Sequence, residues 1–461
     1  MNKAIFLAVA AVMVSPGVPA FAQSAPVATA APAKDWVVKP QWIAAHERFL
    51  AGPELRGRGS ATHDEAVAAA YVASQFEGYG LHHAPGMDRY VQQAKIVRLG
   101  LDGAAQLGVA GKPVDGAALL IGDGREATGT LAVFSGDDLA ALPDTDIIAI
   151  DSDNISAFDA YRAASAKGAR LVIVKADEQT KRLSERFGGR ARMPSYLEGA
   201  EPEQATSLVT VPAEAMKALA AAGGQAVAFS LPGLVRDTKV TTNAVGYLPG
   251  SDPQAGVILF SAHLDHLGMR PDGTMMPGAN DDASGTTAVL ELAHALAAGK
   301  QHRRGILFVA YGSEEIGGFG SKYFGAHPPV PLDDIIANIE VEMIGAQDPK
   351  LPDGTMMMTG FGRSNLGPAL AAHGALVTKD PYPEQHFFQR SDNYSLALKG
   401  VVAHTISGWA VVPTYHSPKD TIGNLDIGFM AKAIQSLIGP ARWLADSDFE
   451  PEWNPGGRPK E

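Results

Sequence analysis

From residue 238 onward, short uninterrupted apolar runs alternate with longer stretches whose apolar residues recur every three or four positions. Continuous apolar runs are typical of strands buried on both faces of a parallel sheet, and the longer spacing is typical of helices. The pattern predicts strands at Val257–Ala262, Gly305–Tyr311, Ile335–Met343 and Val401–Ile406, and helices at Ala283–Ala298 and Ile427–Ala445. This alternation indicates an α/β fold, a mostly parallel twisted sheet flanked by helices.

The stretch 100–237 has a different rhythm. Its apolar runs are short and separated by Gly, Asp and Pro, and one helix is expected at Ala157–Lys167. These features predict a β-rich second domain inserted into the first. The main domain then comprises residues 40–99 and 238–446, and its N-terminal part contains an expected helix at Asp64–Glu77.

The N-terminus has the pattern of a secretory signal peptide. A short start containing Lys3 precedes the apolar run Ala4–Val14, and breaker residues then lead to a small-residue cleavage pattern, so we expect a signal peptide at 1–22. A flexible lead-in is expected at 23–39 and a flexible tail at 447–461. The predicted location is the periplasm or the outside of the cell. The chain has no cysteine, so no disulfides are available to stabilise it.

The charge of the chain bears on its partners. The formal net charge is −12, and losing residues 1–22 with the single charged residue Lys3 would make it −13. An acidic balance argues against nucleic acid or an anionic membrane surface as the partner. No other apolar run reaches about 18 residues, so we expect no membrane anchor after signal cleavage.

Five side chains that can bind metal each lie in a distinctive local string, at or beyond the carboxyl end of an expected strand. The five are His263 in A-H-L-D-H, Asp281 in G-A-N-D-D-A-S-G, Glu315 in G-S-E-E-I-G, Glu342 in E-V-E-M-I-G and His416 in Y-H-S-P-K-D-T. Two imidazoles and three carboxylates suit two borderline cations such as Zn²⁺ that share one bridging carboxylate. In open α/β sheets, this edge is where ligands bind.

These strings resemble those of the di-zinc exopeptidases, a family that includes bacterial leucyl-type aminopeptidases and glutamate carboxypeptidase. The resemblance covers roughly residues 40–100 and 238–445 and also involves T-N-A-V-G-Y-L-P-G (242–250) and R-S-D-N (390–393). Within the inserted stretch, D-I-I-A-I-D, a helix and K-G-A-R-L-V-I-V-K resemble the protease-associated domain found in many of these peptidases.

The resemblance implies two zinc ions per chain and a division of roles among the site residues. His263 and Glu342 would hold one zinc, Glu315 and His416 the other, and Asp281 would bridge the two. Glu314, beside the ligand Glu315, would be the general base. The chain departs from the family at Glu342, where the family usually has Asp.

Further polar residues near these strings are expected to assist. Asp265 lies two residues beyond His263 and is expected to orient its ring, and Asp420 is expected to orient His416. The Tyr415 phenol could stabilise an oxyanion. Glu340 shares a strand face with Glu342, so it either supports that ligand or receives a substrate ammonium. Arg390 is the candidate for binding a substrate carboxylate.

The function that these expectations favour is a zinc-dependent aminopeptidase, in which metal-activated water attacks a peptide and Glu314 takes the proton. A carboxypeptidase or acyl-amino-acid hydrolase of the same fold is the alternative, and Arg390 would then read a free carboxylate. A glutaminyl cyclase would usually hold one zinc. A binding module that had lost its metal would not need the intact ligand set.

Overall fold

The computed structural model describes residues 36–186, 188–200 and 206–460. The helices of the main domain are α1 Pro40–Leu50, α2 His63–Gly78, α6 Ser284–Ala297, α7 Phe319–Ala326, α8 Leu366–Ala372, α9 Asn393–Leu398 and α10 Ile427–Asp446. Its strands are β1 Val91–Leu101, β12 Leu234–Leu248, β13 Val257–His263, β14 Gly268–Met269, β15 Met275–Met276, β16 Gly305–Tyr311, β17 Ile335–Glu342, β18 Met356–Met358, β19 Val377–Lys379 and β20 Val402–Ser407. Among the described residues, no helix is long and apolar enough to cross a bilayer.

The main domain is built on one large mixed sheet. Among the described residues its order is β19-β18-β20-β17-β13-β16-β12-β1-β9, where β9 is Ser195–Leu197. The central strands β16, β13, β17 and β20 are parallel, and β12 and β1 continue the sheet in antiparallel pairing. All residues of β13 and β16 are buried, as continuous apolar runs predict. The predicted α/β class and the predicted strands and helices of this domain are confirmed.

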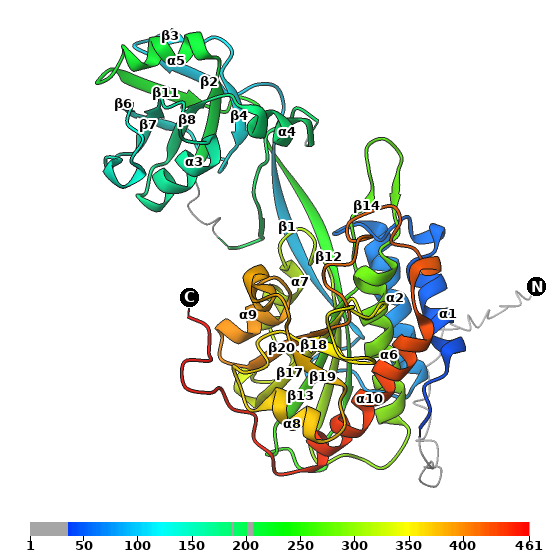
Figure 1. Ribbon diagram of the computed structural model, residues 1–461. Coiled ribbons are helices and arrows are strands. Elements are labelled where there is room, and N and C mark those ends of the chain that lie inside the picture. Colours follow the sequence, from blue (N-terminus) through cyan, green and yellow to red (C-terminus); the bar gives the residue numbers. More distant parts are fainter. Residues whose placement is uncertain (1–35, 187, 201–205, 461) are drawn as a thin grey trace, which may run out of the picture.

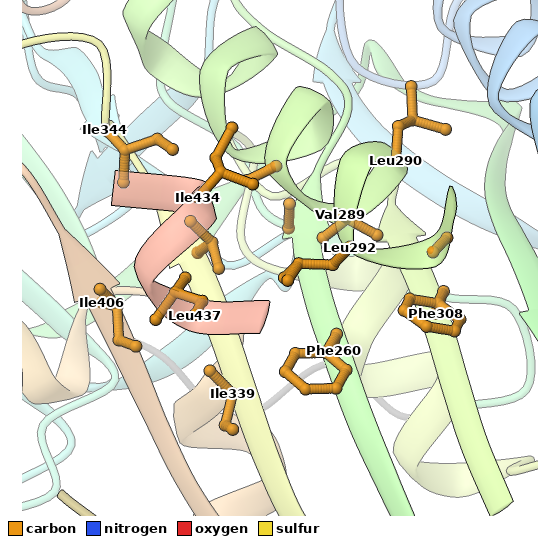
Figure 2. Packing of buried hydrophobic residues seen from close by; sticks show 14 of the residues in the cluster. Phe260, Val289, Leu290, Leu292, Phe308, Ile339, Ile344, Ile406, Ile434 and Leu437 are labelled. Atoms are coloured by element: carbon orange, nitrogen blue, oxygen red, sulfur yellow. The ribbon is translucent and has the colours of Figure 1, made fainter. Parts of the chain in front are cut away.

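Helices cover both faces of this sheet (Figure 1). Helices α1, α2, α6 and α10 lie on one face, and α7 and α9 lie on the other. Figure 2 shows Val289 and Leu292 of α6 facing Phe260 of the sheet, and Leu437 of α10 facing Ile339 and Ile406. Fully burying an aliphatic or aromatic side chain of this size stabilises the fold by roughly 1.5–3 kcal/mol. This packing fixes the ends of the central strands, from which the candidate site is built.

The inserted segment forms a separate lobe at the far end of the long β1–β12 ribbon (Figure 1). Its elements are β2 Gln106–Val109, β3 Lys112–Pro113, β4 Ala118–Ile121, β5 Ala127–Thr130, β6 Ala132–Phe134, β7 Ile147–Ile150, α3 Ala157–Ala166, β8 Leu171–Lys175, α4 Glu178–Arg186, β10 Ser207–Val211, α5 Ala213–Ala220 and β11 Ala226–Ser230. They form a five-stranded and a four-stranded sheet among the described residues. One strand of the stretch, β9 Ser195–Leu197, instead pairs with β1 and joins the main sheet. The predicted boundaries at 100 and 237 therefore fall inside continuous strands.

The segments expected to be flexible at the two ends of the domain are packed where the structure describes them. The buried Val38 donates its N–H to Gln435 on α10 at 2.9 Å, so residues 36–39 do not belong to a free lead-in. In the predicted tail, the Trp453 indole donates to the Gly400 carbonyl at 2.9 Å, and Arg304 donates to the Phe449 carbonyl at 2.8 Å. The expected signal peptide at 1–22 lies outside the described residues.

Candidate metal centre

Asp281 lies at the centre of the site and presents one carboxylate oxygen to each of two groups. Its Oδ1 is 3.2 Å from His263 Nε2, and its Oδ2 is 3.2 Å from His416 Nε2. On the first side, Glu342 Oε1 lies 3.9 Å from His263 Nε2. On the second side, Glu315 Oε2 lies 3.0 Å from His416 Nε2. All five predicted ligands are therefore brought together, with Asp281 shared.

The chemistry of these side chains fits a pair of divalent cations. Three buried polar atoms of the cluster, His263 Nε2, Asp281 Oδ2 and Glu315 Oε1, have no hydrogen-bond partner among the described residues. Leaving such atoms unpaired costs about 1–3 kcal/mol each, so a partner is needed. Imidazole nitrogens and carboxylate oxygens are the ligands that zinc takes in catalytic sites.

The electrostatics of the cluster also favours bound positive charge. Burial raises the pKa of Glu342 to about 8. Burial alone would also raise the pKa of Asp281, but the His263 and His416 imidazoles lower it well below its usual range. Burial alone would lower the pKa of His416, but Asp281 and Glu315 raise it to about 9. Without metal, the buried negative charge of Asp281 is balanced by positively charged imidazoles. A bound cation can supply that positive charge instead.

The sheet topology explains why residues so distant in sequence meet. His263 is the last residue of β13, and Glu342 is the last residue of β17. The chain turns from the end of β16 into Glu314 and Glu315. Because β13 lies between β16 and β17 and runs parallel to both, the three carboxyl ends lie at one edge. Asp281 comes to this edge on the loop before α6.

Three residues in or next to the cluster have a left-handed backbone, which is unusual for residues other than glycine. They are Ser313 with φ 58°, Met343 with φ 54° and His416 with φ 50°. Such conformations cost of order 1–3 kcal/mol each and persist where the surroundings enforce them. The Ser313 hydroxyl donates to Glu65 at 2.9 Å, and the Met343 N–H donates to Asp282 at 3.0 Å. These turns aim Glu314, Glu342 and His416, and no local sequence signal predicts them.

The adjacent carboxylates Glu314 and Glu315 have different surroundings. The Glu315 side chain contacts His416 and also His266, whose Nδ1 is 2.7 Å from its Oε1. No hydrogen bond or ion pair holds the Glu314 carboxylate among the described residues, and burial raises its pKa well above the usual value. This contrast fits Glu315 as a ligand and leaves Glu314 available for proton transfer.

Asp265 contacts the site differently from the prediction. Its carboxylate is 3.7 Å from His263 Nδ1, too long for a hydrogen bond, and the ring nitrogen instead lies 3.2 Å from the Asp265 carbonyl oxygen. The carboxylate accepts the N–H groups of Glu314 at 3.0 Å and Glu315 at 3.4 Å and the Ser60 hydroxyl at 2.5 Å. Asp265 therefore positions the Glu314–Glu315 turn at least as directly as it orients His263.

The prediction that Asp420 orients His416 is wrong. Asp420 accepts the backbone N–H groups of Asn280 at 2.8 Å and Asp281 at 3.0 Å. It therefore fixes the loop that carries the shared carboxylate. Asp282 also helps to fix this loop. Its Oδ1 accepts the Gly285 N–H at 2.8 Å and so ties the loop to the first turn of α6.

Glu340 does not reach the open part of the site. It is fully buried, and its carboxylate accepts the Ser391 hydroxyl at 2.9 Å, the Asn393 N–H at 2.7 Å and the Thr405 hydroxyl at 2.9 Å. One donor reaches Oε1 and two reach Oε2, so three of the roughly four acceptor sites of this carboxylate are taken. Of the two roles expected for Glu340, this arrangement fits the support of its surroundings, and ammonium binding stays a prediction.

A pocket opens beside Glu342. Its lining includes Glu342, Met343, Phe387, Arg390, Ser391 and Tyr415. Tyr415 is 38% exposed, and its ring stacks on the His416 ring with centroids 3.8 Å apart. The exposed Arg390 lies over the Phe387 ring at 4.9 Å. The pocket thus brings the two predicted substrate-facing residues, Arg390 and Tyr415, to the Glu342 side of the cluster.

His266 is the residue of the site that the sequence prediction missed. It is fully buried and lies within the second group, beside Asp281 and Glu315. The available signal was its place three residues after His263 in the same A-H-L-D-H string.

Arg58 holds the metal-binding loops together without reaching the cluster carboxylates. This fully buried side chain donates to the carbonyl oxygens of Leu264 at 2.8 Å, Leu50 at 2.8 Å, Pro277 at 2.7 Å and Gly278 at 2.7 Å. The first of these follows His263, and the last two precede Asp281. Arg58 therefore connects the N-terminal segment to both loops.

We expect Arg58→Gln to lower the free energy of unfolding by about 3–5 kcal/mol, because several buried carbonyl groups lose a charged donor at once. Urea denaturation of the metal-free protein measures the loss. Arg270→Gln is the matched control, because Arg270 is exposed and makes one long contact of 3.5 Å to the His416 carbonyl. Equal urea midpoints for the two variants would contradict the assignment of Arg58 as a clamp.

Comparison with known proteins agrees with this geometry. Residues 243–438, which contain all five predicted ligands, match the sequence profile of peptidase family M28. This part of the chain, less than half of its length, is therefore similar to peptidase family M28. Among curated proteins, the chain is 35% identical over 119 residues to leupeptin-inactivating enzyme 1 of Streptomyces exfoliatus, covering 24% of this chain and 26% of that protein. It is 27% identical over 212 residues to a probable leucine aminopeptidase of Trichophyton verrucosum, covering 43% of this chain and 56% of that protein.

A likeness in fold extends over most of the chain. The structure of BSAP, a zinc aminopeptidase from Bacillus subtilis, superposes with a TM-score of 0.54 at 17% identity and covers 93% of this chain and 99% of that chain. At this level of identity the likeness shows the fold. The matches to the two curated relatives span about a quarter and about half of their lengths.

Proposed function

We propose that this protein is a zinc-dependent aminopeptidase that removes the N-terminal residue from peptides. The observation that carries the proposal is the Asp281 carboxylate, whose two oxygens each lie 3.2 Å from a different imidazole. One carboxylate shared in this way suits two metal ions. The names of an M28 relative and of a structural neighbour, a leucine aminopeptidase and a zinc aminopeptidase, support the choice of metal and reaction.

The proposed ligands form two sets. His263, Asp281 and Glu342 would hold one zinc, and Asp281, Glu315 and His416 the other. When bound, a zinc pair polarises a carbonyl and makes an attacking water more acidic. Two sets of metal ligands argue against a glutaminyl cyclase, which would usually hold one zinc. Because neither set lacks a ligand, they also argue against a binding module that has lost its metal.

Within this site, Glu314 would take the proton from the attacking water and pass it to the leaving amine. Its carboxylate is unheld among the described residues, and its backbone is fixed by Asp265. Tyr415 would donate a hydrogen bond to the developing oxyanion, since burial and the nearby carboxylates raise its pKa and keep the phenol protonated.

The α-ammonium of the substrate would meet carboxylates at the mouth of the pocket, and Glu342 is the acidic residue that lines it. Glu342, rather than the buried Glu340, is thus the residue proposed to receive the ammonium. One observation favours a second candidate, a carboxypeptidase or acyl-amino-acid hydrolase. Arg390 is exposed, lines the same pocket and has no carboxylate partner among the described residues. It could bind a free carboxylate.

We also propose that the segment 1–22 is a signal peptide and that the protein acts in the periplasm or outside the cell. The positive start and the short apolar run support this. The lobe of residues 100–237 is proposed to be a protease-associated domain, on the strength of its resemblance in sequence.

A metal analysis combined with a substrate panel tests the function. We expect about two zinc ions per chain, loss of activity on chelation and recovery on adding Zn²⁺ or Co²⁺. N-acetylation of a peptide should lower kcat/KM at least about tenfold, because it removes a charge-assisted contact of roughly 1.5–3 kcal/mol. C-terminal amidation should have little effect.

Arg390→Ala separates the two candidate functions. An aminopeptidase variant should cleave aminoacyl-nitroanilides near the original rate. Ready cleavage of N-blocked peptides, refusal of C-terminal amides and loss of activity in Arg390→Ala would favour the carboxypeptidase. Full activity in the metal-stripped protein would end both proposals.

A further inference from the structure

His266 is held rigidly inside the metal centre. Its backbone N–H donates to the Arg58 carbonyl at 3.0 Å, and the residue pairs with Gly59 in an isolated bridge. Gly278, with φ 62°, packs against the imidazole so closely that an added Cβ would lie 2.5 Å from His266 Cγ. Only glycine tolerates both this backbone conformation and this contact. The backbone contacts and the close packing of Gly278 therefore fix the position of the imidazole ring.

In this position the His266 ring faces two proposed ligands, Glu315 and Asp281. His266 Nδ1 is 2.7 Å from Glu315 Oε1 and 3.8 Å from Asp281 Oδ2. One ligand atom from each of these three residues lies within 4.8 Å of the other two. The His416 ring is close by, with centroids 5.7 Å apart. This is the spacing of side chains that share an ion.

The ring also lacks any other partner. Both nitrogens of His266 are buried and have no hydrogen-bond partner among the described residues, and the short contact with Glu315 Oε1 does not have the geometry of a hydrogen bond. An imidazole buried at 0% exposure without partners costs free energy that a metal ion would recover. His263 Nε2, which faces the other group, is unpartnered in the same way.

We propose that His266 is a sixth metal ligand and that it makes the two metal sites unequal. The site of Glu315 and His416 then has four protein donors, two imidazoles and two carboxylates. The site of His263 and Glu342 has three and keeps room for water and substrate. Four protein ligands are typical of tightly held zinc, and three with an open position are typical of reactive zinc. The Glu315 site therefore fills first.

The proposal rests on the two-metal centre and is tested by binding rather than by turnover. Metal-free protein is titrated with Co²⁺, and the visible absorption of the ion and the heat of binding are recorded. His266→Asn should weaken the tighter of two binding events by more than about 100-fold, because loss of a residue that only supports a ligand already costs about 10- to 100-fold. The weaker event should change less than about twofold.

Glu342→Gln is the matched control, because it should weaken the other binding event and leave the tighter one in place. X-ray absorption of the wild-type protein with one equivalent of zinc provides a readout that needs no variant. It should show two imidazoles on the ion, His266 and His416. One imidazole, or unchanged Co²⁺ binding in a folded His266→Asn, would overturn the proposal. Equal weakening of both events would also overturn it, since His266 would then only support the loop.

These outcomes are separate from failure of the proposed function. If the wild-type protein binds neither Co²⁺ nor Zn²⁺, both the proposed metallopeptidase function and the proposed role of His266 are wrong. Wild-type protein that binds two ions, but with one imidazole on the first, leaves the metallopeptidase standing and removes only His266 from its ligands.

Discussion

Glu314→Gln is expected to lower kcat by about 10²- to 10⁴-fold, the usual contribution of a general base, while the protein keeps its metal. The amide has nearly the shape of the carboxylate but cannot accept the proton of the attacking water. The Glu314 N–H would still donate to Asp265, so the turn should keep its place. Steady-state kinetics on an aminoacyl-nitroanilide and metal analysis of the same sample check both parts.

Glu315→Gln is the matched comparison, because the same chemical change is made one residue away. Its side chain contacts His416 at 3.0 Å and His266 at 2.7 Å, so this variant should lose metal as well as activity. Added Zn²⁺ should restore part of the activity of Glu315→Gln and none of that of Glu314→Gln. The reverse pattern would exchange the roles of the two residues.

The apolar pattern predicted the central part of the fold closely. Gly305–Tyr311 is β16 with the predicted bounds, and Val257–Ala262 is extended by one residue to His263 in β13. Such strands are buried on both faces, so nearly every position is apolar and the signal is strong. Residues 36–39 of the expected lead-in and the described part of the expected tail are packed, because a single residue can anchor such a segment. Trp453 does so with one indole hydrogen bond to Gly400.

The five proposed ligands, which the structure brings together, each lie in a recognisable string, whereas the residues that support them could not be predicted. Arg58 donates a hydrogen bond to the Leu264 carbonyl, 206 residues away in the sequence. Every residue has a backbone carbonyl, so no sequence pattern identifies which one accepts such a bond. Asp420 was assigned to His416 because the two are close in sequence, but it accepts N–H groups from the loop of Asp281, 139 residues away. Proximity along the chain is a poor guide where a loop folds back on another.

Glu340 shows a further limit of pattern reasoning. Alternation along β17 correctly places it on the same face as Glu342, yet the two carboxylates have different surroundings. Thr405 on the neighbouring strand β20 and the segment of Ser391 and Asn393 hydrogen-bond to Glu340. Glu342 lies at the strand end, where the pocket begins. A strand pattern gives the face of a sheet, and the tertiary packing decides which residue on that face is accessible.

Asp281→Asn should reduce metal content from about two ions to one or none and lower kcat/KM by roughly 10³-fold or more, a loss of about 4 kcal/mol. Asparagine keeps one acceptor oxygen and replaces the other with an NH₂ group. It can therefore serve the His263 side or the His416 side, but not both. Metal analysis after dialysis against low micromolar Zn²⁺ gives the content, and kinetics at saturating Zn²⁺ give the activity.

Asp272→Asn is the control for this variant, because Asp272 is exposed and accepts the Thr274 N–H within its own turn. It should keep both ions and full activity. Asp420→Asn should give an intermediate result, since one oxygen can still accept from Asn280 or Asp281 and the loop keeps part of its support. Asp281→Asn protein that retained two ions and activity within about tenfold would mean that the carboxylate is not shared. The two metal groups would then be independent, and the case for joint action of the two ions on one carbonyl would fail.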